Sequence, residues 1–188
     1  AATSFPKPEA VYRRVDVVLR EISGNPGRAS HRMALEASRV IYRGREAAAR
    51  VINLSDSGRL AFTKNATEAI NIALKGLLKA GDHVITTSFE HNSVVKTLAR
   101  VEKDGVSVTK VRPDKEGFVS PGDIEAAITP KTRMVCISHA SNVFGTLQPV
   151  AVIGAICRDR GVLFMVDGAQ TVGAVPVDIE AMSLDILA

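Results

Sequence analysis

The pattern of apolar and polar positions along the chain changes near residue 58. Before that point, apolar residues recur at three- and four-residue spacing over 9–22 and again over 30–53. This spacing predicts two amphipathic helices, separated by a Gly/Asn/Pro-rich loop. We therefore expect residues 1–58 to form an N-terminal helical segment. The buried side of its second helix is expected to include Met33, Ala37, Ile41, Ala48 and Ile52.

From residue 60 onward, short β-rich runs alternate with helical ones. Such alternation indicates βα units on a mostly parallel sheet, with helices on both faces. We therefore expect residues 59–188 to form a large α/β domain that is incomplete in this chain. The predicted strands are 60–63, 83–87, 106–111, 134–138 and 162–166. Helices are expected to end at 78 and 102, and to begin at 121 and near 150.

The last predicted strand runs directly into Asp167. Its five consecutive apolar residues are typical of a central strand that is buried on both faces. A carboxylate at the end of such a strand needs a cationic or hydrogen-bonding partner. Ligands of open α/β sheets bind at the carboxyl ends of the strands. From this stretch alone, Asp167 is either a ligand-facing acid or a structural acid in a helix cap or ion pair.

Polar residues also follow the other predicted strands. Asn65 and Glu68 resemble a capping box, and the free N–H groups of that helix N-terminus suit a phosphate. His91 offers a flat ring, the loop 139–145 offers amide donors, and Gln170 follows Asp167 closely. Each of these features has an ordinary structural alternative, but together they match pyridoxal 5'-phosphate. A carboxylate that keeps the pyridine ring of this cofactor protonated makes the ring an electron sink.

Composition excludes several other classes of function. The net charge of +4 comes from 24 basic and 20 acidic residues that are mixed along the chain, so no nucleic-acid partner is expected. No apolar run is long enough to cross a membrane. Cys136 and Cys157 lie in apolar runs and are expected to be reduced, buried thiols of an intracellular protein, with no metal site. Neither G-x-G-x-x-G nor the P-loop pattern is present, so the phosphate-binding glycines of those folds are missing.

Several motifs together resemble the class V aminotransferase-like fold of pyridoxal-phosphate enzymes, and within it the cysteine desulfurases and selenocysteine lyases. The resemblance extends over the whole chain. Its motifs are residues 1–8, Asn25-Pro26-Gly27-Arg28, Asn65-Ala66-Thr67-Glu68-Ala69-Ile70-Asn71, Glu90-His91-Asn92-Ser93, Ser141-Asn142-Val143-Phe144-Gly145 and Val166-Asp167-Gly168-Ala169-Gln170.

The resemblance implies a role for each matching residue. Ala66 and Thr67 would hold the cofactor phosphate, and His91 would stack on the pyridine ring as the catalytic histidine. Asp167 would bind the ring nitrogen and Gln170 the phenolic oxygen. A further set would lie on the substrate side, with Asn142 at the substrate carboxylate or the ring hydroxyl, and Asn25 and Arg28 in a loop at the dimer contact.

The implied activity is that of a cysteine desulfurase, which converts L-cysteine to L-alanine and leaves the sulfur on an enzyme cysteine as a persulfide. The resemblance also implies a cytoplasmic homodimer, a sulfur-acceptor protein as partner and a place in iron–sulfur cluster assembly. In this family the lysine that forms the Schiff base lies just beyond the segment matching 183–188, so this chain alone is expected to be inactive. Among the lysines that are present, Lys64 is the nearest contender for this role, and its ordinary explanation is an exposed or capping lysine.

Three alternatives stay open at this point. Another class V aminotransferase or a β-eliminating lyase would share the same motifs. A second alternative is that the chain alone is a non-catalytic fragment, which binds pyridoxal phosphate weakly or not at all. An unrelated nucleotide-binding module would share only the fold class.

Overall fold

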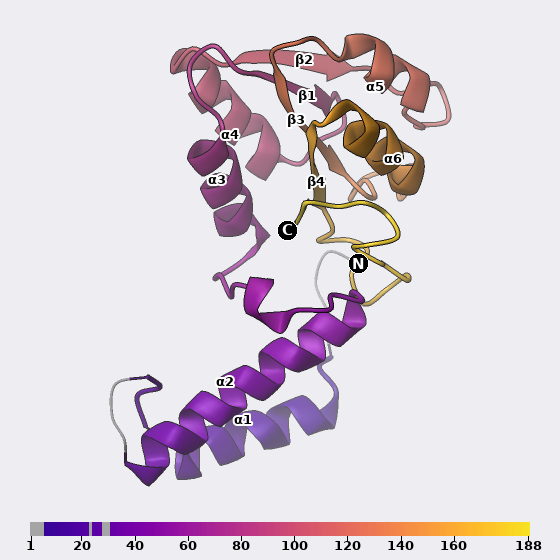
Figure 1. Cartoon of the computed structure of the whole chain (residues 1–188). Coiled ribbons are helices and arrows are strands. Elements are labelled where there is room, and N and C mark those ends of the chain that lie inside the picture. The colour runs from indigo at the N-terminus through magenta and orange to yellow at the C-terminus, as the bar shows by residue number, and fades with distance from the viewer. Residues whose placement is uncertain (1–5, 23, 28–30) are drawn as a thin grey trace. The chain divides into compact units, whose positions relative to one another are not determined.

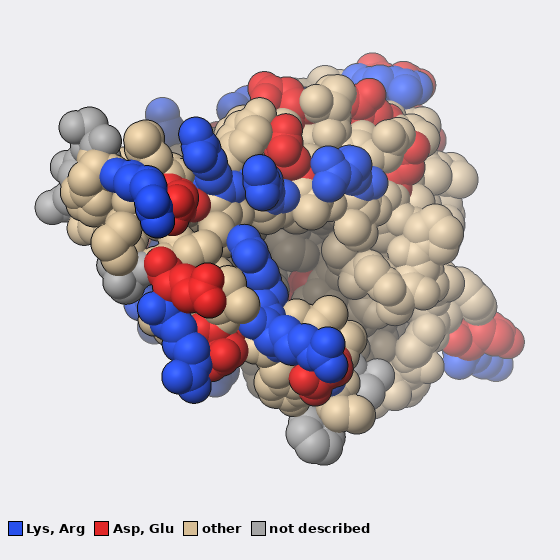
Figure 2. Space-filling model, turned by 90° about the horizontal axis from the view of Figure 1, so that it is seen from below, with Lys and Arg blue, Asp and Glu red and all other residues tan. Residues whose placement is uncertain are grey.

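A computed structural model describes residues 6–22, 24–27 and 31–188, and the chain forms two compact units, Ala1–Ala61 and Phe62–Ala188. None of the helices in the described residues combines the length and apolar character needed to cross a membrane. Lys and Arg side chains alternate with Asp and Glu on the face shown in Figure 2, in line with the small net charge.

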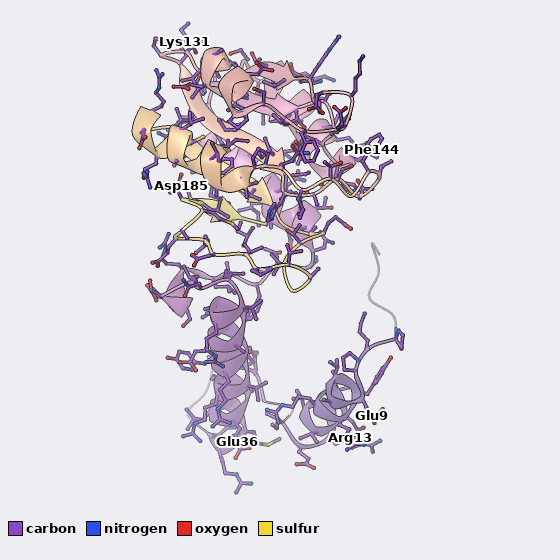
Figure 3. The ribbon with its side chains drawn as sticks, turned by 90° about the vertical axis from the view of Figure 1, so that its right-hand side faces the viewer. Glu9, Arg13, Glu36, Lys131, Phe144 and Asp185 are labelled. Atoms are coloured by element: carbon purple, nitrogen blue, oxygen red, sulfur yellow. The ribbon has the colours of Figure 1, made fainter. Side chains whose placement is uncertain are left out.

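The N-terminal unit contains two helices, α1 (Glu9–Glu21) and α2 (Arg32–Val51), followed by a short 3-10 turn, η1 (Ser57–Arg59). Both predicted helices are confirmed. No residue of α1 is buried. Ion pairs between successive turns stabilise its exposed surface modestly, and one of them joins Arg13 to Glu9 at 3.2 Å (Figure 3).

The buried side of α2 differs in part from the expected one. Ala37 and Ile52 are buried, and Ala48 is half-buried, but Met33 and Ile41 are each 40% exposed. The prediction for Met33 and Ile41 is therefore wrong. Within the described residues of this unit, α1 buries no residue, and the residues that α2 buries are alanines, which need less cover than Met33 or Ile41.

The second unit is built on a five-stranded parallel sheet with the strand order β2-β1-β3-β4-β5 (Figure 1). The predicted α/β class is confirmed. The strands are β1 (His83–Thr87), β2 (Ser107–Val111), β3 (Thr132–Ser138), β4 (Leu163–Asp167) and β5 (Ile186–Leu187). The helices are α3 (Ala66–Leu77), α4 (Asn92–Lys103), α5 (Pro121–Ala127) and α6 (Val150–Arg160).

Helices cover both faces of this sheet. In Figure 1, α3 and α4 lie on one side of the sheet and α5 and α6 on the other. The first face packs into one apolar cluster, which includes Ile70, Leu74, Val94, Leu98, Met134, Cys136 and Met165. On the opposite face α6 approaches closely enough that a Cβ on Gly154 would meet the ring of Phe164 at 3.2 Å. Burial of both faces explains why β4 reads as a continuous apolar run.

One predicted strand is wrong, and one strand of the structure was not predicted. Residues 60–63 form no strand, because they lie exposed or half-exposed ahead of α3 and Phe62 is 57% exposed. A strand over Ile186–Leu187 was not predicted, and it pairs with β4 through only two residues. A two-residue strand has no periodicity that a sequence pattern could reveal.

Candidate active site

The carboxyl ends of β1, β3 and β4 are neighbours in the sheet, and a pocket of about 180 Å³ lies there beside the N-terminus of α3. This is the edge at which ligands of parallel sheets bind. The pocket is lined by all the residues that the sequence assigned to a cofactor, although they come from separate segments of the chain. These residues are Ala66, Thr67, His91, Asn142, Asp167 and Gln170.

The N-terminus of α3 forms one wall of the pocket. Asn65 caps the helix, because its Oδ1 accepts the N–H of Glu68 at 2.9 Å. The Glu68 carboxylate accepts the N–H of Lys64 at 2.7 Å, so the return bond of the predicted capping pair goes to the residue before Asn65. The N–H groups of Ala66 and Thr67 have no acceptor within the helix. They are therefore available to an anion such as a phosphate.

Asp167 is the last residue of β4 and is only 6% exposed. Its Oδ1 accepts the N–H of Ala169 at 3.0 Å, and no Lys or Arg of the described residues forms an ion pair with it. Burial raises the pKa of Asp167, whereas the Ala169 N–H and the charge of His91 lower it. A buried carboxylate with so little compensation is costly. It is suited to a cationic N–H donor from a ligand.

His91 caps α4 and also lines the pocket. Its Nδ1 accepts the N–H of Ser93 at 3.2 Å and lies 2.8 Å from Ser93 Oγ. Because Nδ1 accepts from the backbone, the proton of the neutral ring is assigned to Nε2. The side chain is exposed, so the histidine combines a structural cap with a flat ring that is free to contact an aromatic ligand.

A loop after β3 carries Asn142 to the pocket. Its base is closed by Gln148, whose N–H donates to the carbonyl of His139 at 2.8 Å. Phe144, which is labelled in Figure 3, belongs to this loop and stacks on Phe89 with the ring centroids 4.8 Å apart. These contacts hold the segment that contains Asn142 against the end of the sheet.

The side-chain amides of Asn142 and Gln170 complete the polar lining. In the part of the chain that the structure describes, neither amide forms a hydrogen bond to another protein group. Each amide has N–H donors and a carbonyl acceptor. Both amides are therefore available to the polar substituents of a ligand.

Glu90 was not among the predicted site residues, although it directly precedes His91. Thr87 Oγ1 donates to its Oε1 at 2.6 Å, and Ser138 Oγ donates to its Oε2 at 2.8 Å. Burial raises the pKa of Glu90, the two hydroxyls and the backbone of Ser138 lower it, and the charge of Asp167 raises it further. An acid that follows a buried strand was the signal in the sequence. Its link to Ser138, a pocket residue, depends on strand pairing and is visible only in the fold.

Five other residues considered from the sequence are not among those that line the pocket in the described part of the chain. Asn25 is exposed and belongs to the N-terminal unit, and Arg28 lies outside the described residues. Lys64 is exposed and does not line the pocket. Cys136 and Cys157 are buried free cysteines, as predicted. Among the described residues, no group of His, Cys, Asp and Glu side chains could hold a metal ion.

Comparison with known proteins identifies the family of this chain. The family model for class V aminotransferases matches residues 1–188. A probable cysteine desulfurase of Methanothermobacter thermautotrophicus is 40% identical over the whole chain, which covers 47% of that relative. Cysteine desulfurase IscS of Photorhabdus laumondii is 34% identical, again over the whole chain and 47% of the relative. The chain thus spans about half the length of these curated relatives.

Two solved structures have the same fold and about the same sequence identity to the chain. A structure of SspA in complex with cysteine has a TM-score of 0.92 at 31% identity, and the match covers 100% of this chain and 55% of that one. The apo structure of a cysteine desulfurase from Thermococcus onnurineus has a TM-score of 0.89 at 29% identity, and covers 96% of this chain and 46% of that one.

Proposed function

The chain belongs to the class V aminotransferase family, and from this premise we propose that it is the cofactor-binding part of a pyridoxal 5'-phosphate-dependent cysteine desulfurase. The names of its relatives support this choice within the family, as does the structural neighbour solved with cysteine. The full reaction would convert L-cysteine to L-alanine and leave the sulfur as a persulfide on an enzyme cysteine.

One observation in the structure carries the assignment of the cofactor. Asp167 is a buried carboxylate with no Lys or Arg partner among the described residues, and it shares a pocket with the uncapped N–H groups at the start of α3. A ligand that carries both a ring N–H cation and a phosphate satisfies both features. Pyridoxal 5'-phosphate has these two groups, so the residues present fit it.

In this proposal each of the six pocket residues named from the sequence has a defined task. The N–H groups of Ala66 and Thr67 would bind the phosphate, and the ring of His91 would lie against the pyridine ring. Asp167 would keep the ring nitrogen protonated, and the amides of Asn142 and Gln170 would bind oxygen substituents. The cofactor, once its ring nitrogen is protonated, supplies an electron sink for charge that develops on an amino-acid substrate.

Neither cysteine of the chain is proposed as the persulfide carrier. Burial and the charge of Asp185 raise the pKa of Cys157 to about 12. Burial raises the pKa of Cys136 well above its ordinary value, and the charges of Glu90 and Asp167 raise it further. The thiolate is the nucleophilic form, so both thiols are poor nucleophiles at neutral pH. The acceptor cysteine is proposed to lie elsewhere in the protein.

The remaining assignments rest on family resemblance alone. We propose that the protein acts as a cytoplasmic homodimer, in which Asn25 and Arg28 lie near the dimer contact. A sulfur-acceptor protein would take the sulfur from the persulfide. The relatives named IscS support iron–sulfur cluster assembly as its destination.

The reaction with cysteine tests this proposal directly. The purified full-length protein is incubated with pyridoxal 5'-phosphate, L-cysteine and a thiol reductant, and alanine and sulfide are measured together. Equal amounts of alanine and sulfide support a desulfurase. Pyruvate and ammonia would indicate a β-eliminating lyase instead, and amino transfer to a 2-oxo acid without sulfide would indicate an aminotransferase. A Cys136→Ala, Cys157→Ala double variant is expected to keep the activity, because both thiols are buried.

A further inference from the structure

Glu90 places a second carboxylate behind the wall of the pocket, and the proposed function leaves it without a task. Both of its oxygens accept hydroxyl hydrogen bonds, Oε1 from Thr87 at 2.6 Å and Oε2 from Ser138 at 2.8 Å. No Lys or Arg of the described residues forms an ion pair with it. Burying a carboxylate without a cationic partner costs folding free energy. Carboxylates in such environments are common at functional sites.

Ser138 connects this carboxylate to the pocket. It is the last residue of β3, its register partner on β4 is Asp167, and it lines the pocket. Paired residues of neighbouring strands project from the same face of a sheet. Glu90, Ser138 and Asp167 therefore form a row of oxygen atoms across three adjacent strand ends.

The direction of the hydrogen bond to Glu90 determines what Ser138 can offer a ligand. A serine hydroxyl has one proton and two lone pairs. Because the proton is donated to Glu90 Oε2, only lone pairs remain for the pocket. The wall formed by Ser138 and Asp167 then contains acceptors and no donor.

We propose that Glu90 is a positioning residue, which acts through Ser138 to make this wall selective for a ring nitrogen that carries a proton. The proposal rests on the proposed pyridoxal-phosphate site and deepens it. The titratable groups near the wall are Asp167, Glu90 and His91. The two carboxylates repel each other, and a ring cation placed between the pocket amides and Asp167 relieves that repulsion. A ring with carbon in place of nitrogen has no N–H proton and no positive charge, so it forms no hydrogen bond with this wall.

Two ligands separate this role from a structural one. Pyridoxine 5'-phosphate lacks an aldehyde, so it forms no lysine adduct, and its analogue with C–H in place of the ring nitrogen differs only at the atom in question. The dissociation constants of both ligands are measured by titration calorimetry at pH 7. The readout is their ratio, since general damage to the pocket weakens both ligands alike.

The wild-type protein is expected to bind the pyridine ligand more tightly than the carbon analogue. Glu90→Gln and Ser138→Ala are each expected to lower this preference by about three- to tenfold, the effect of losing one hydrogen-bonded interaction. The double variant should lose little more than either single variant, because Glu90 acts through Ser138. Ser138→Thr keeps a hydroxyl and should retain the preference. The matched control Glu116→Gln removes one acidic charge from an exposed turn and should leave the ratio unchanged.

Different results would overturn different claims. If the wild-type protein prefers the pyridine ligand and Glu90→Gln keeps the ratio, the role of Glu90 is wrong while the cofactor site stands. The same conclusion follows if Glu90→Gln weakens both ligands equally. If the wild-type protein binds neither ligand, or shows no preference, the proposed cofactor site fails and the role of Glu90 fails with it.

Discussion

Ser138 and Asp167 are register partners at the carboxyl ends of neighbouring parallel strands. Two residues earlier on the same strands, Cys136 and Met165 belong to the apolar cluster beneath α3 and α4. Because side chains alternate along a strand, Ser138 and Asp167 continue that face beyond the end of the core. The pocket is therefore the polar extension of a well-packed layer, which positions its oxygen atoms on rigid strands.

Replacing Asp167 by Asn is expected to stabilise the cofactor-free protein. Burial holds the pKa of Asp167 above its ordinary value, so at pH 7 the ionised group costs free energy in the folded state that it does not cost in the unfolded one. Asn keeps an oxygen that can accept the N–H of Ala169. We expect Tm to rise by a few degrees in thermal unfolding, since about 1 kcal/mol shifts Tm by roughly 2–4 °C at this chain length. The exposed control Asp159→Asn should show no such rise, and a lower Tm for Asp167→Asn would contradict the account.

Ala66→Pro tests the role of one backbone N–H group. Ala66 is the first residue of α3, where proline is well tolerated, and the preceding Asn65 is extended, with φ of −170° and ψ of 170°. The substitution removes the N–H that is proposed to bind phosphate and leaves the helix intact. Affinity for pyridoxal 5'-phosphate should fall about tenfold, the loss expected for one hydrogen bond to a charged group. Affinity for pyridoxal, which has no phosphate, should stay the same. Equal losses for both ligands would exclude a phosphate contact at this position.

His83 makes the stability of the fold depend on pH. Its ring spans three strands, with Nδ1 2.8 Å from Thr132 Oγ1 and Nε2 2.8 Å from Thr109 Oγ1, and burial lowers its pKa. Below about pH 6.5 the unfolded chain binds a proton that the folded chain does not, so this residue reduces stability as the pH falls. The raised pKa values of Glu90 and Asp167 act in the opposite direction, because there the folded chain binds protons first.

Comparison with a variant isolates the contribution of His83. The free energy of unfolding is measured in denaturant at pH 7.5 and pH 5.5 for the wild type and for His83→Gln. When the pH is lowered from 7.5 to 5.5, the free energy of unfolding of the wild type should fall relative to that of the variant, because only the wild type has His83. An identical change in both proteins would show that His83 is protonated equally in the folded and unfolded states.

Two glycines in helices should respond in opposite ways to alanine. A Cβ on Gly154 of α6 would collide with the carbonyl oxygen of Met182, whereas a Cβ on Gly76 of α3 would meet no atom within 4 Å. Gly154→Ala should lower the free energy of unfolding by about 1–3 kcal/mol through overpacking. Gly76→Ala should raise it by about 0.5–1 kcal/mol, because alanine has less conformational freedom to lose. Chemical denaturation measures both, and a neutral Gly154→Ala would mean that α6 has room to move away from Met182.

Sequence reasoning predicted the elements whose pattern is long and regular. It succeeded for the βα units from β1 to β4, because buried strands and amphipathic helices have distinct periodicities. It failed at Phe62, where an apolar residue is exposed, and at β5, which is too short to have a period. The exposure of Met33 depends on what covers α2, which the sequence of α2 itself does not record.

The same distinction applies to the candidate site. Asp167 and His91 each follow a predicted strand, so the local pattern pointed to them before the fold was known, whereas Thr67 was assigned through the family resemblance. Glu90 becomes notable only through its hydrogen bond to Ser138, a residue 48 positions away in the chain. Contacts of that kind depend on strand order, and a single sequence does not give the strand order directly.

The most direct test of the proposed function is an absorbance titration of the protein with pyridoxal 5'-phosphate, in the wild type and in Asp167→Asn. The wild type is predicted to bind the cofactor with a saturable change in its absorbance. The variant should bind at least about tenfold more weakly, because it loses the carboxylate that pairs with the ring cation. Equal binding by both proteins, or no saturable binding by the wild type, would contradict a pyridoxal-phosphate site at the end of β4.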